Sequence, residues 1–376
     1  MNKKAIILLT VLWSVLQFML FQKVSVFNSE EAHKYIYEAY YLNTFHRFSY
    51  PHYFLYSFYI AIHWIFLKTG FELAGVYTLQ LIFSYWSTVI MYKLIIRYTS
   101  SINIAVAGTF IWLLCFQYQK FTAFLYTESL FGSLIILHSY WLLTKPKTRN
   151  NIFILLLLSV AIITMRPTGI IFIPVWIVYA CYILLKRGQK ISVLFISFIT
   201  LLAMSSLLYL IMNRTDLGFN FMLPFTDNNV LCYIPEKSLQ QYHLQLNNST
   251  NAIGALLFYI LHNPMHFLQA SFLKIVAYFG MTRSYYSFAH NLYLQLFYYP
   301  IYLLAITGMW LNRKSLPSWM IYSLISIFFF TLSIILTCED WSNRFMVPIT
   351  PFIVLLGIYG ASVLYKKYFL KNKSPL

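Results

Sequence analysis

Apolar runs of about 15 to 24 residues recur along almost the whole chain, separated by short polar breaks. Each run is close to the length of helix that crosses a hydrocarbon core about 30 Å thick, at about 1.5 Å per residue. In the 376 residues, 60% are hydrophobic and only 10% are charged, which excludes an ordinary soluble domain. We therefore predict an all-α, polytopic integral membrane protein in which residues 1–376 form a single domain.

Ten of these runs are predicted to be membrane spans. They are 5–25, 72–94, 102–119, 126–143, 151–165, 168–185, 191–212, 290–311, 317–337 and 346–365. The first run follows Lys3 and Lys4, but no small-residue cleavage site comes after it. We interpret it as a retained span and not as a signal peptide.

The distribution of lysine and arginine predicts how these spans are threaded. With a cytoplasmic N-terminus, the inner segments hold more than half of the 27 basic residues and no acid. All ten acidic residues then fall on the outer side. The formal net charge of +17 is therefore a topology signal, and nucleic acid is not an expected partner.

Two further apolar stretches are predicted to lie in the outer interface. Counting 50–67 as a span would invert the next three basic clusters, and its Tyr, His and Trp content suits the interface. The stretch 256–280 is broken by HNP at 262–264 and is placed there too. The outer loops then cover about 26–71 and 213–289. Because long loops commonly carry function, we expect any chemistry on the extracytoplasmic side.

Glu30 and Glu31 directly follow the first span, in the stretch FNSEEAHKYIYEAYY. Loop acids are usually only solvated, but here acids are scarce, and aromatic and small residues repeat at helical spacing. A short surface helix would turn Glu31 and Glu38 toward one face and His33 and Tyr37 toward another. We predict that Glu30 or Glu31 is a general base, and the sequence leaves open which of them.

Other candidate residues lie near the outer ends of the predicted spans. Placing Glu128 in an apolar setting costs about 2.5–3.5 kcal/mol or more, so we expect it to cap a helix, pair with a cation or bind a substrate hydroxyl. Arg166 and Arg344 either anchor helix ends or bind a phosphate through paired hydrogen bonds. Lys274 and Arg283, near the end of the broken stretch, are further candidates for phosphate binding.

Histidine spacing gives little support for a metal site. His262 and His266 are separated by Pro264 and have no acid nearby in the sequence, and His33 with Glu30 is only a weak pair. We expect neither a metal ion nor another cofactor. The sequence also has no phosphate-cradling glycine loop and no nucleophile elbow, so nucleotide and serine hydrolysis are unsupported.

The four cysteines have no metal-like spacing. Cys232 and Cys338 fall on the same predicted side of the membrane, which leaves a disulfide open. We interpret them as two unrelated cysteines.

Several short segments, taken in order, resemble the GT-C glycosyltransferases that use polyprenyl-phosphate sugars. FNSEEAH resembles the acidic start of the first lumenal loop in protein O-mannosyltransferases and in the aminoarabinose transferase of lipid A. FSYPHYFLY is similar to their interfacial helix and LYTESLFGSL to their acidic turn before the fourth span. TMRPTG, HNPMHFLQASFLK and NRFMVPITPFIVLLGIYG are similar to further recurring segments.

The sequence also departs from that family. Its first acid is normally aspartate, where this chain has Glu30, and the mannosyltransferases' His-Pro-Pro corresponds only to YPH. The ending also resembles mannosyltransferases that build the glycosylphosphatidylinositol anchor and the lipid-linked N-glycan precursor. The subfamily therefore stays open.

The resemblance implies that a first-loop glutamate deprotonates an acceptor hydroxyl, which then attacks the anomeric carbon with inversion. The donor would be a polyprenyl-phosphate sugar, and the acceptor a glycan, a lipid or a protein. Arg344 and Arg166 would stabilise the leaving phosphate, and Glu128 would orient the acceptor or an arginine. The other substrate-binding candidates are His33, Lys274 and Arg283. No divalent metal would be required. We expect a bacterial inner membrane with the site on its extracytoplasmic face, and an endoplasmic reticulum membrane stays open as the alternative.

Three alternatives stay open at this point. A transporter or flippase for a lipid-linked saccharide usually has internal repeats and ionisable residues at mid-membrane, whereas no repeat is found here and every acid maps to one surface. A polymerase of lipid-linked glycan units would not need the acidic pair at this position. The third alternative is a membrane protein with a purely structural role.

Overall fold

The structure is a computed structural model, and it describes residues 2–191, 193, 222–247 and 252–370. The helices are α1 (Lys3–Val24), α2 (Glu31–Phe45), α3 (Ser57–Lys68), α4 (Glu72–Thr99), α5 (Ile102–Leu113), α6 (Phe116–Gln119), α7 (Thr127–Thr144), α8 (Arg149–Met165), α9 (Phe172–Lys186), α11 (Leu223–Thr226), α12 (Ala252–His262), α13 (Pro264–Gly280), α14 (Phe288–Leu311), α15 (Ser318–Leu336) and α16 (Thr350–Tyr365). Short helical turns are η1 (Pro51–Tyr56), η2 (Lys120–Thr122), η3 (Pro167–Ile171), η5 (Lys237–Leu239), η6 (Arg344–Met346) and η7 (Lys366–Leu370). The named strands of the described residues are β1 (Asn229–Leu231) and β2 (Ile234–Pro235), an antiparallel pair. The all-α prediction is confirmed.

Five described helical segments are long and apolar enough to cross a membrane. They are α1, α4, α14, α15 and the segment Pro167–Lys186, which joins η3 to α9. A sixth span results if α5 and Phe116–Thr122, bent by 57°, are counted as one. These helices are compatible with an integral membrane protein.

The prediction of ten spans is not confirmed. With 17 and 16 residues, α8 and α16 are about 24–26 Å long at 1.5 Å per residue, shorter than a hydrocarbon core of about 30 Å. In α7, the polar residues Glu128, Ser133 and His138 interrupt the apolar sequence. The predicted span 191–212 lies almost entirely outside the described residues.

The two predicted interfacial stretches form short helices. Residues 50–67 become η1 followed by α3, which has 12 residues and buries Tyr59 and His63. Residues 256–280 become α12 and α13, and the predicted break is present at Asn263. Neither α3 nor α13 is among the helices that could cross a membrane.

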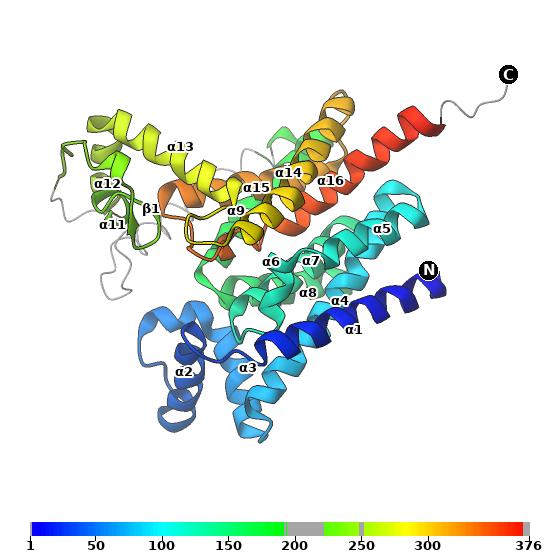
Figure 1. Ribbon diagram of the computed structural model, residues 1–376, viewed down its shortest axis with the longest axis horizontal. Coiled ribbons are helices and arrows are strands. Elements are labelled where there is room, and N and C mark those ends of the chain that lie inside the picture. The colour runs from blue at the N-terminus through cyan, green and yellow to red at the C-terminus, as the bar shows by residue number, and fades with distance from the viewer. Residues whose placement is uncertain (1, 192, 194–221, 248–251, 371–376) are drawn as a thin grey trace.

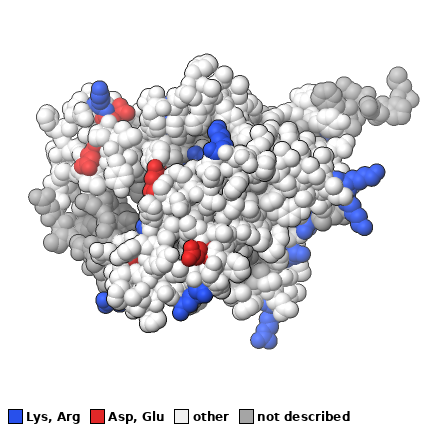
Figure 2. Space-filling model, turned by 60° about the horizontal axis from the view of Figure 1, so that its bottom comes forward, with Lys and Arg blue, Asp and Glu red and all other residues white. Residues whose placement is uncertain are grey.

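The long helices run roughly along the horizontal axis of Figure 1. The start of α1 and the end of α16 lie at the right, whereas α2 and the α11–α13 region lie at the left. In Figure 2, which keeps this axis, carboxylates are visible only in the left half and the right margin shows basic residues alone. The acidic end is our name for the region where α2, the start of α7 and the segment 337–349 meet.

Helices α14 and α16 pack closely because glycines face each other between them. A Cβ on Gly360 would lie 1.9 Å from the carbonyl oxygen of Leu304, and a Cβ on Gly308 would lie 2.6 Å from Cα of Gly360. Both distances are far inside van der Waals contact, so small residues are required there. This packing fixes α16, and with it the turn η6 that precedes α16 and begins at Arg344.

Cys232 and Cys338 form a disulfide, so the interpretation of two unrelated cysteines was wrong. The two residues are 106 positions apart in the chain. They meet because β1 extends into a parallel bridge in which Leu231 pairs with Glu339. No local sequence pattern predicts this pairing, because it depends on how the long loop folds back.

Candidate functional site

Five charged side chains from four segments gather at the acidic end. Nη1 of Arg344 contacts the carboxylate of Glu31 and lies 3.9 Å from Oε1 of Glu128, while Nε of Arg344 lies 2.8 Å from Oδ2 of Asp340. Oε1 of Glu128 also lies 2.7 Å from Nη1 of Arg166. We call Glu31, Glu128, Arg166, Asp340 and Arg344 the charged cluster. Arg344 is its centre, since it is close to all three acids.

Local sequence explains how Glu128 and Arg166 enter the cluster. Glu128 lies in the first turn of α7, where free backbone N–H groups favour a carboxylate. Arg166 follows α8 in an extended conformation because Pro167 disfavours helical geometry at the residue before it. Glu128 does not cap its helix, since the cap position is Tyr126 and forms no side-chain capping bond. Of the roles expected for Glu128, pairing with a cation is the one that the structure shows.

The carboxylate of Glu31 is held by three neighbours. Besides Arg344, its Oε1 accepts hydrogen bonds from Nζ of Lys34 at 2.5 Å and from Oη of Tyr35 at 2.8 Å. Burial raises the pKa of Tyr35 well above its ordinary value, so the hydroxyl keeps its proton and remains a donor. Glu31 is therefore a fixed ion-pair partner.

Glu30 is placed very differently from its neighbour. It is exposed, and its carboxylate accepts one hydrogen bond, from Oη of Tyr126 at 3.1 Å. Its backbone has φ 55° and ψ −118°, a conformation that residues with a side chain rarely adopt. Strained backbone of this kind is common at functional sites. Of the two glutamates, Glu30 has the more exposed carboxylate, and no cation of the described residues forms an ion pair with it.

The predicted helix after these acids is present as α2. Tyr35 and Glu38 are buried, whereas His33 and Tyr37 are exposed on the other face. Glu38 accepts hydrogen bonds from the backbone and side chain of Ser49. Glu38 thus holds the loop that follows α2, and His33 is not part of the charged cluster.

Arg344 keeps its positive charge within the cluster. Its side chain is 22% exposed, and the side chains of Glu128 and Arg166 are 1% and 7% exposed. Burial lowers the pKa of Arg344 to about 10, while the nearby charge of Glu30 acts in the opposite direction. A guanidinium with this pKa is still protonated at neutral pH, and its charge is matched here by the carboxylates of Glu31, Glu128 and Asp340.

Charged residues that were not chosen from the sequence also lie in or beside the cluster, among them Lys34, Asp340 and Lys120. Lys34 binds Glu31, and Asp340 binds Arg344. Lys120 is half-buried in η2, and none of the described carboxylates lies within ion-pair distance of its Nζ. Asp340 and Arg344 are four residues apart in the chain, and this spacing could have indicated their ion pair from the sequence.

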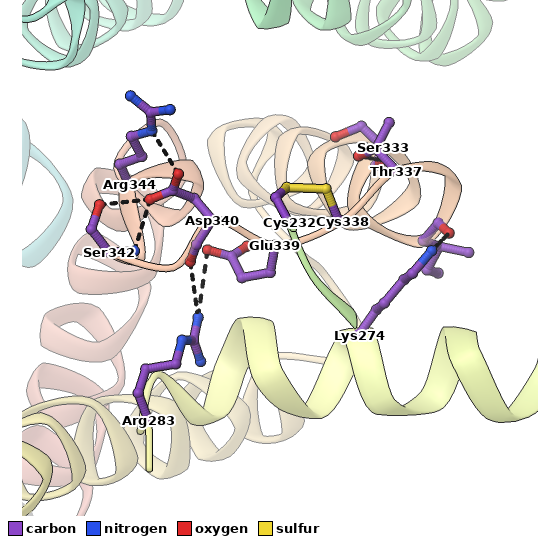
Figure 3. The surroundings of a disulfide bond; sticks show 11 residues. Cys232, Lys274, Arg283, Ser333, Thr337, Cys338, Glu339, Asp340, Ser342 and Arg344 are labelled. Atoms are coloured by element: carbon purple, nitrogen blue, oxygen red, sulfur yellow. Dashed lines mark hydrogen bonds and ion pairs between the residues drawn. A yellow bond between two sulfur atoms is a disulfide. The ribbon is translucent and has the colours of Figure 1, made fainter. Parts of the chain in front are cut away.

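Lys274 and Arg283 do not join the charged cluster. Figure 3 shows Lys274 on the opposite side of the disulfide from Arg344. Its Nζ donates to the carbonyl of Ile335 at 3.2 Å and lies 4.1 Å from the ring centroid of Phe225. Arg283 points toward Glu339, 3.8 Å away, and toward the Asp340 backbone. These cations hold the long loop rather than line the cluster.

The histidines of the broken stretch are also structural. His266 is buried and hydrogen-bonded to Tyr259 and to Oδ1 of Asn228, whereas His262 is exposed. Among the described residues, there is no group of three or more His, Cys, Asp or Glu side chains arranged to hold a metal ion.

A comparison of this chain with protein-family models, curated proteins and solved structures finds no match. The resemblance to GT-C glycosyltransferases is therefore carried by the sequence segments alone.

Proposed function

We propose that this protein is a membrane glycosyltransferase that moves a sugar from a polyprenyl-phosphate donor to an acceptor hydroxyl. One observation carries the proposal: the exposed carboxylate of Glu30 is adjacent in the chain to Glu31, which contacts the cation Arg344. A proton acceptor and a phosphate-binding charge are the two groups that this reaction needs. The site is proposed to face the extracytoplasmic side of a bacterial inner membrane.

Glu30 is proposed as the general base, because Glu31 is already engaged by Lys34, Tyr35 and Arg344. The acceptor oxygen forms a bond to the anomeric carbon while the bond from that carbon to the phosphate oxygen breaks. The hydroxyl proton passes to Glu30, and the electron pair leaves with the polyprenyl phosphate. Attack from the side opposite the phosphate inverts the anomeric centre.

The leaving phosphate is proposed to bind Arg344 and Lys120. Arg344 offers a planar guanidinium that suits a phosphate, and the ammonium of Lys120 has no carboxylate partner among the described residues. Because these charges are in place before the reaction, they stabilise the negative charge that grows on the phosphate. Arg166 is paired with Glu128, and Glu128 in turn lies 3.9 Å from Arg344 and is proposed to help hold it.

The proposal is tested with purified protein in nanodiscs and a panel of radiolabelled polyprenyl-phosphate sugars and acceptors. Glu30→Gln is expected to lower kcat by about 10²–10⁴-fold, the range typical of a lost general base. Glu72→Gln is the matched control, since Glu72 is an exposed acid at the start of α4. Full turnover in Glu30→Gln would reject Glu30 as the base. A wild-type protein that transfers no sugar from any donor, but moves the lipid across proteoliposomes, would replace the transferase with a transporter.

A further inference from the structure

The segment 338–346, which carries Arg344 into the charged cluster, is held by other parts of the chain through its backbone carbonyls. The carbonyl of Glu339 accepts from the backbone N–H of Cys232 at 2.8 Å, and that of Asp340 from Nη2 of Arg283 at 3.3 Å. The carbonyl of Trp341 accepts from Oη of Tyr285 and of Tyr286, at 2.5 and 3.0 Å. The carbonyl of Ser342 accepts from Nε2 of Gln117, and that of Phe345 from Oη of Tyr278 at 3.2 Å. We call 338–346 the clasp segment. An irregular segment held at so many points has one defined position.

The β1 region and the disulfide fasten the start of the clasp segment. The backbone N–H of Cys232 donates to the carbonyl of Glu339 at 2.8 Å, and the backbone N–H of Glu339 donates to the carbonyl of Val230 at 3.0 Å. The Cys232–Cys338 disulfide lies beside these two bonds. Figure 3 shows the disulfide next to Glu339, with Asp340 and Arg344 beyond it. The covalent bond is therefore only two residues from Asp340.

The side chain of Asp340 links this fastened start to the charged cluster. Its Oδ1 accepts hydrogen bonds from the backbone N–H and Oγ of Ser342, at 2.8 and 2.6 Å, which fixes the direction of the carboxylate. Its Oδ2 accepts the bond from Nε of Arg344 at 2.8 Å. With Nε occupied, the Nη1 end of Arg344 is directed toward Glu31 and Glu128.

We propose that Asp340 is a positioning residue that fixes the direction of Arg344, the side chain proposed to bind the donor phosphate, and that the Cys232–Cys338 disulfide holds Asp340 in place. Asp340 itself need not touch the substrate. The long loop that contains β1 would thereby set the geometry of the phosphate-binding charge. The kinetic consequence rests on the proposed function, whereas the orientation of Arg344 does not.

The first test measures the chemical reactivity of Arg344, which depends on whether Asp340 holds it, and does not use activity. Arg344 is modified with phenylglyoxal, and the modified fraction is mapped by mass spectrometry. Asp340→Asn keeps an acceptor for Ser342 but loses the charge that binds Arg344, so the modification rate is expected to rise about tenfold. Glu72→Gln is the matched control, because it neutralises an exposed acid at the start of α4 and leaves the Asp340–Arg344 contact intact. An unchanged rate in Asp340→Asn would overturn the positioning role, whatever the protein catalyses.

The second test removes the disulfide. In Cys232→Ala/Cys338→Ala, hydrogen exchange of peptides from the clasp segment is expected to be about tenfold faster than in Cys181→Ala, which keeps the disulfide. Exchange in α14 and α16 reports whether the fold is intact. Unchanged exchange in the clasp segment, with those helices protected, would overturn the role of the disulfide.

The third test uses the proposed reaction. Asp340→Asn is expected to raise KM for the polyprenyl-phosphate donor about tenfold and to leave KM for the acceptor unchanged. Asp340→Glu restores a carboxylate and is expected to recover part of this loss. A donor KM equal to wild type in Asp340→Asn would overturn the kinetic part of the proposal. If wild type has no transferase activity, the proposed function fails, and the modification and exchange results still decide the structural part.

Discussion

Oε1 of Glu128 and Nη1 of Arg166 are 2.7 Å apart, and both side chains are almost completely buried where α7 begins and α8 ends. A buried charge that loses its partner is left without compensation in an apolar environment. The pair therefore constrains how these two helices meet beneath Arg344.

We predict that Arg166→Met lowers the free energy of unfolding by about 3–5 kcal/mol, because Glu128 is then buried without its closest cation. The double variant Glu128→Gln/Arg166→Met is expected to recover much of this loss. Unfolding in a mixed-micelle titration measures both values. Equal losses in the single and double variants would mean that the pair is not coupled.

Glu30 combines an exposed carboxylate with an unfavourable backbone conformation, and these two properties can be separated by substitution. Glu30→Gly is expected to stabilise the fold by about 1 kcal/mol, because glycine adopts this φ and ψ without strain. Glu30→Gln keeps the strain and is expected to melt like wild type. Thermal unfolding of both variants decides this, and a lower Tm for Glu30→Gly would show that the conformation is not strained.

Lys274 makes the stability dependent on pH. Burial lowers the pKa of Lys274 to about 7, against about 10.4 in an unfolded chain. Between about pH 7 and 10 the unfolded chain binds a proton that the folded chain lacks, so this residue makes stability rise with pH. Below about pH 7 both states carry the proton, and its unfavourable contribution is constant and largest.

Lys274→Met is accordingly expected to raise Tm most near pH 7, with a difference from wild type that shrinks toward pH 10. Lys237→Met, which removes an exposed lysine in η5, is the control and is expected to have no such dependence. Differential scanning fluorimetry across this pH range measures both variants. A Tm difference for Lys274→Met that is constant with pH would contradict the lowered pKa.

The contact between α14 and α16 predicts a large effect for a very small substitution. In Gly360→Ala the new methyl group would overlap the carbonyl oxygen of Leu304, so the helices must separate, at a cost of about 1–3 kcal/mol. Gly280→Ala is the control, because the nearest atom to its Cβ would be Oη of Tyr299 at 4.0 Å. A Gly360→Ala variant as stable as Gly280→Ala would contradict the close packing.

The local sequence determined the helical class, most helix positions and the presence of charged residues at one end of the molecule. Apolar periodicity and lysine distribution are local properties, so they predict α1, α4, α14 and α15 and the helix that follows Glu30. The count of ten spans is not confirmed, because α8 and α16 are shorter than a hydrocarbon core of about 30 Å and 191–212 lies almost entirely outside the described residues.

Only the tertiary structure decided which charged residues meet. Arg344 is more than 300 positions from Glu31 in the chain, and the cysteines of the disulfide are 106 positions apart. Such contacts depend on how helices pack, for example on the glycines that bring α16 against α14. The sequence determined that Glu30 and Glu31 are adjacent. Only the folded chain paired Glu31 with Arg344 and left Glu30 exposed, with Tyr126 as its hydrogen-bond partner.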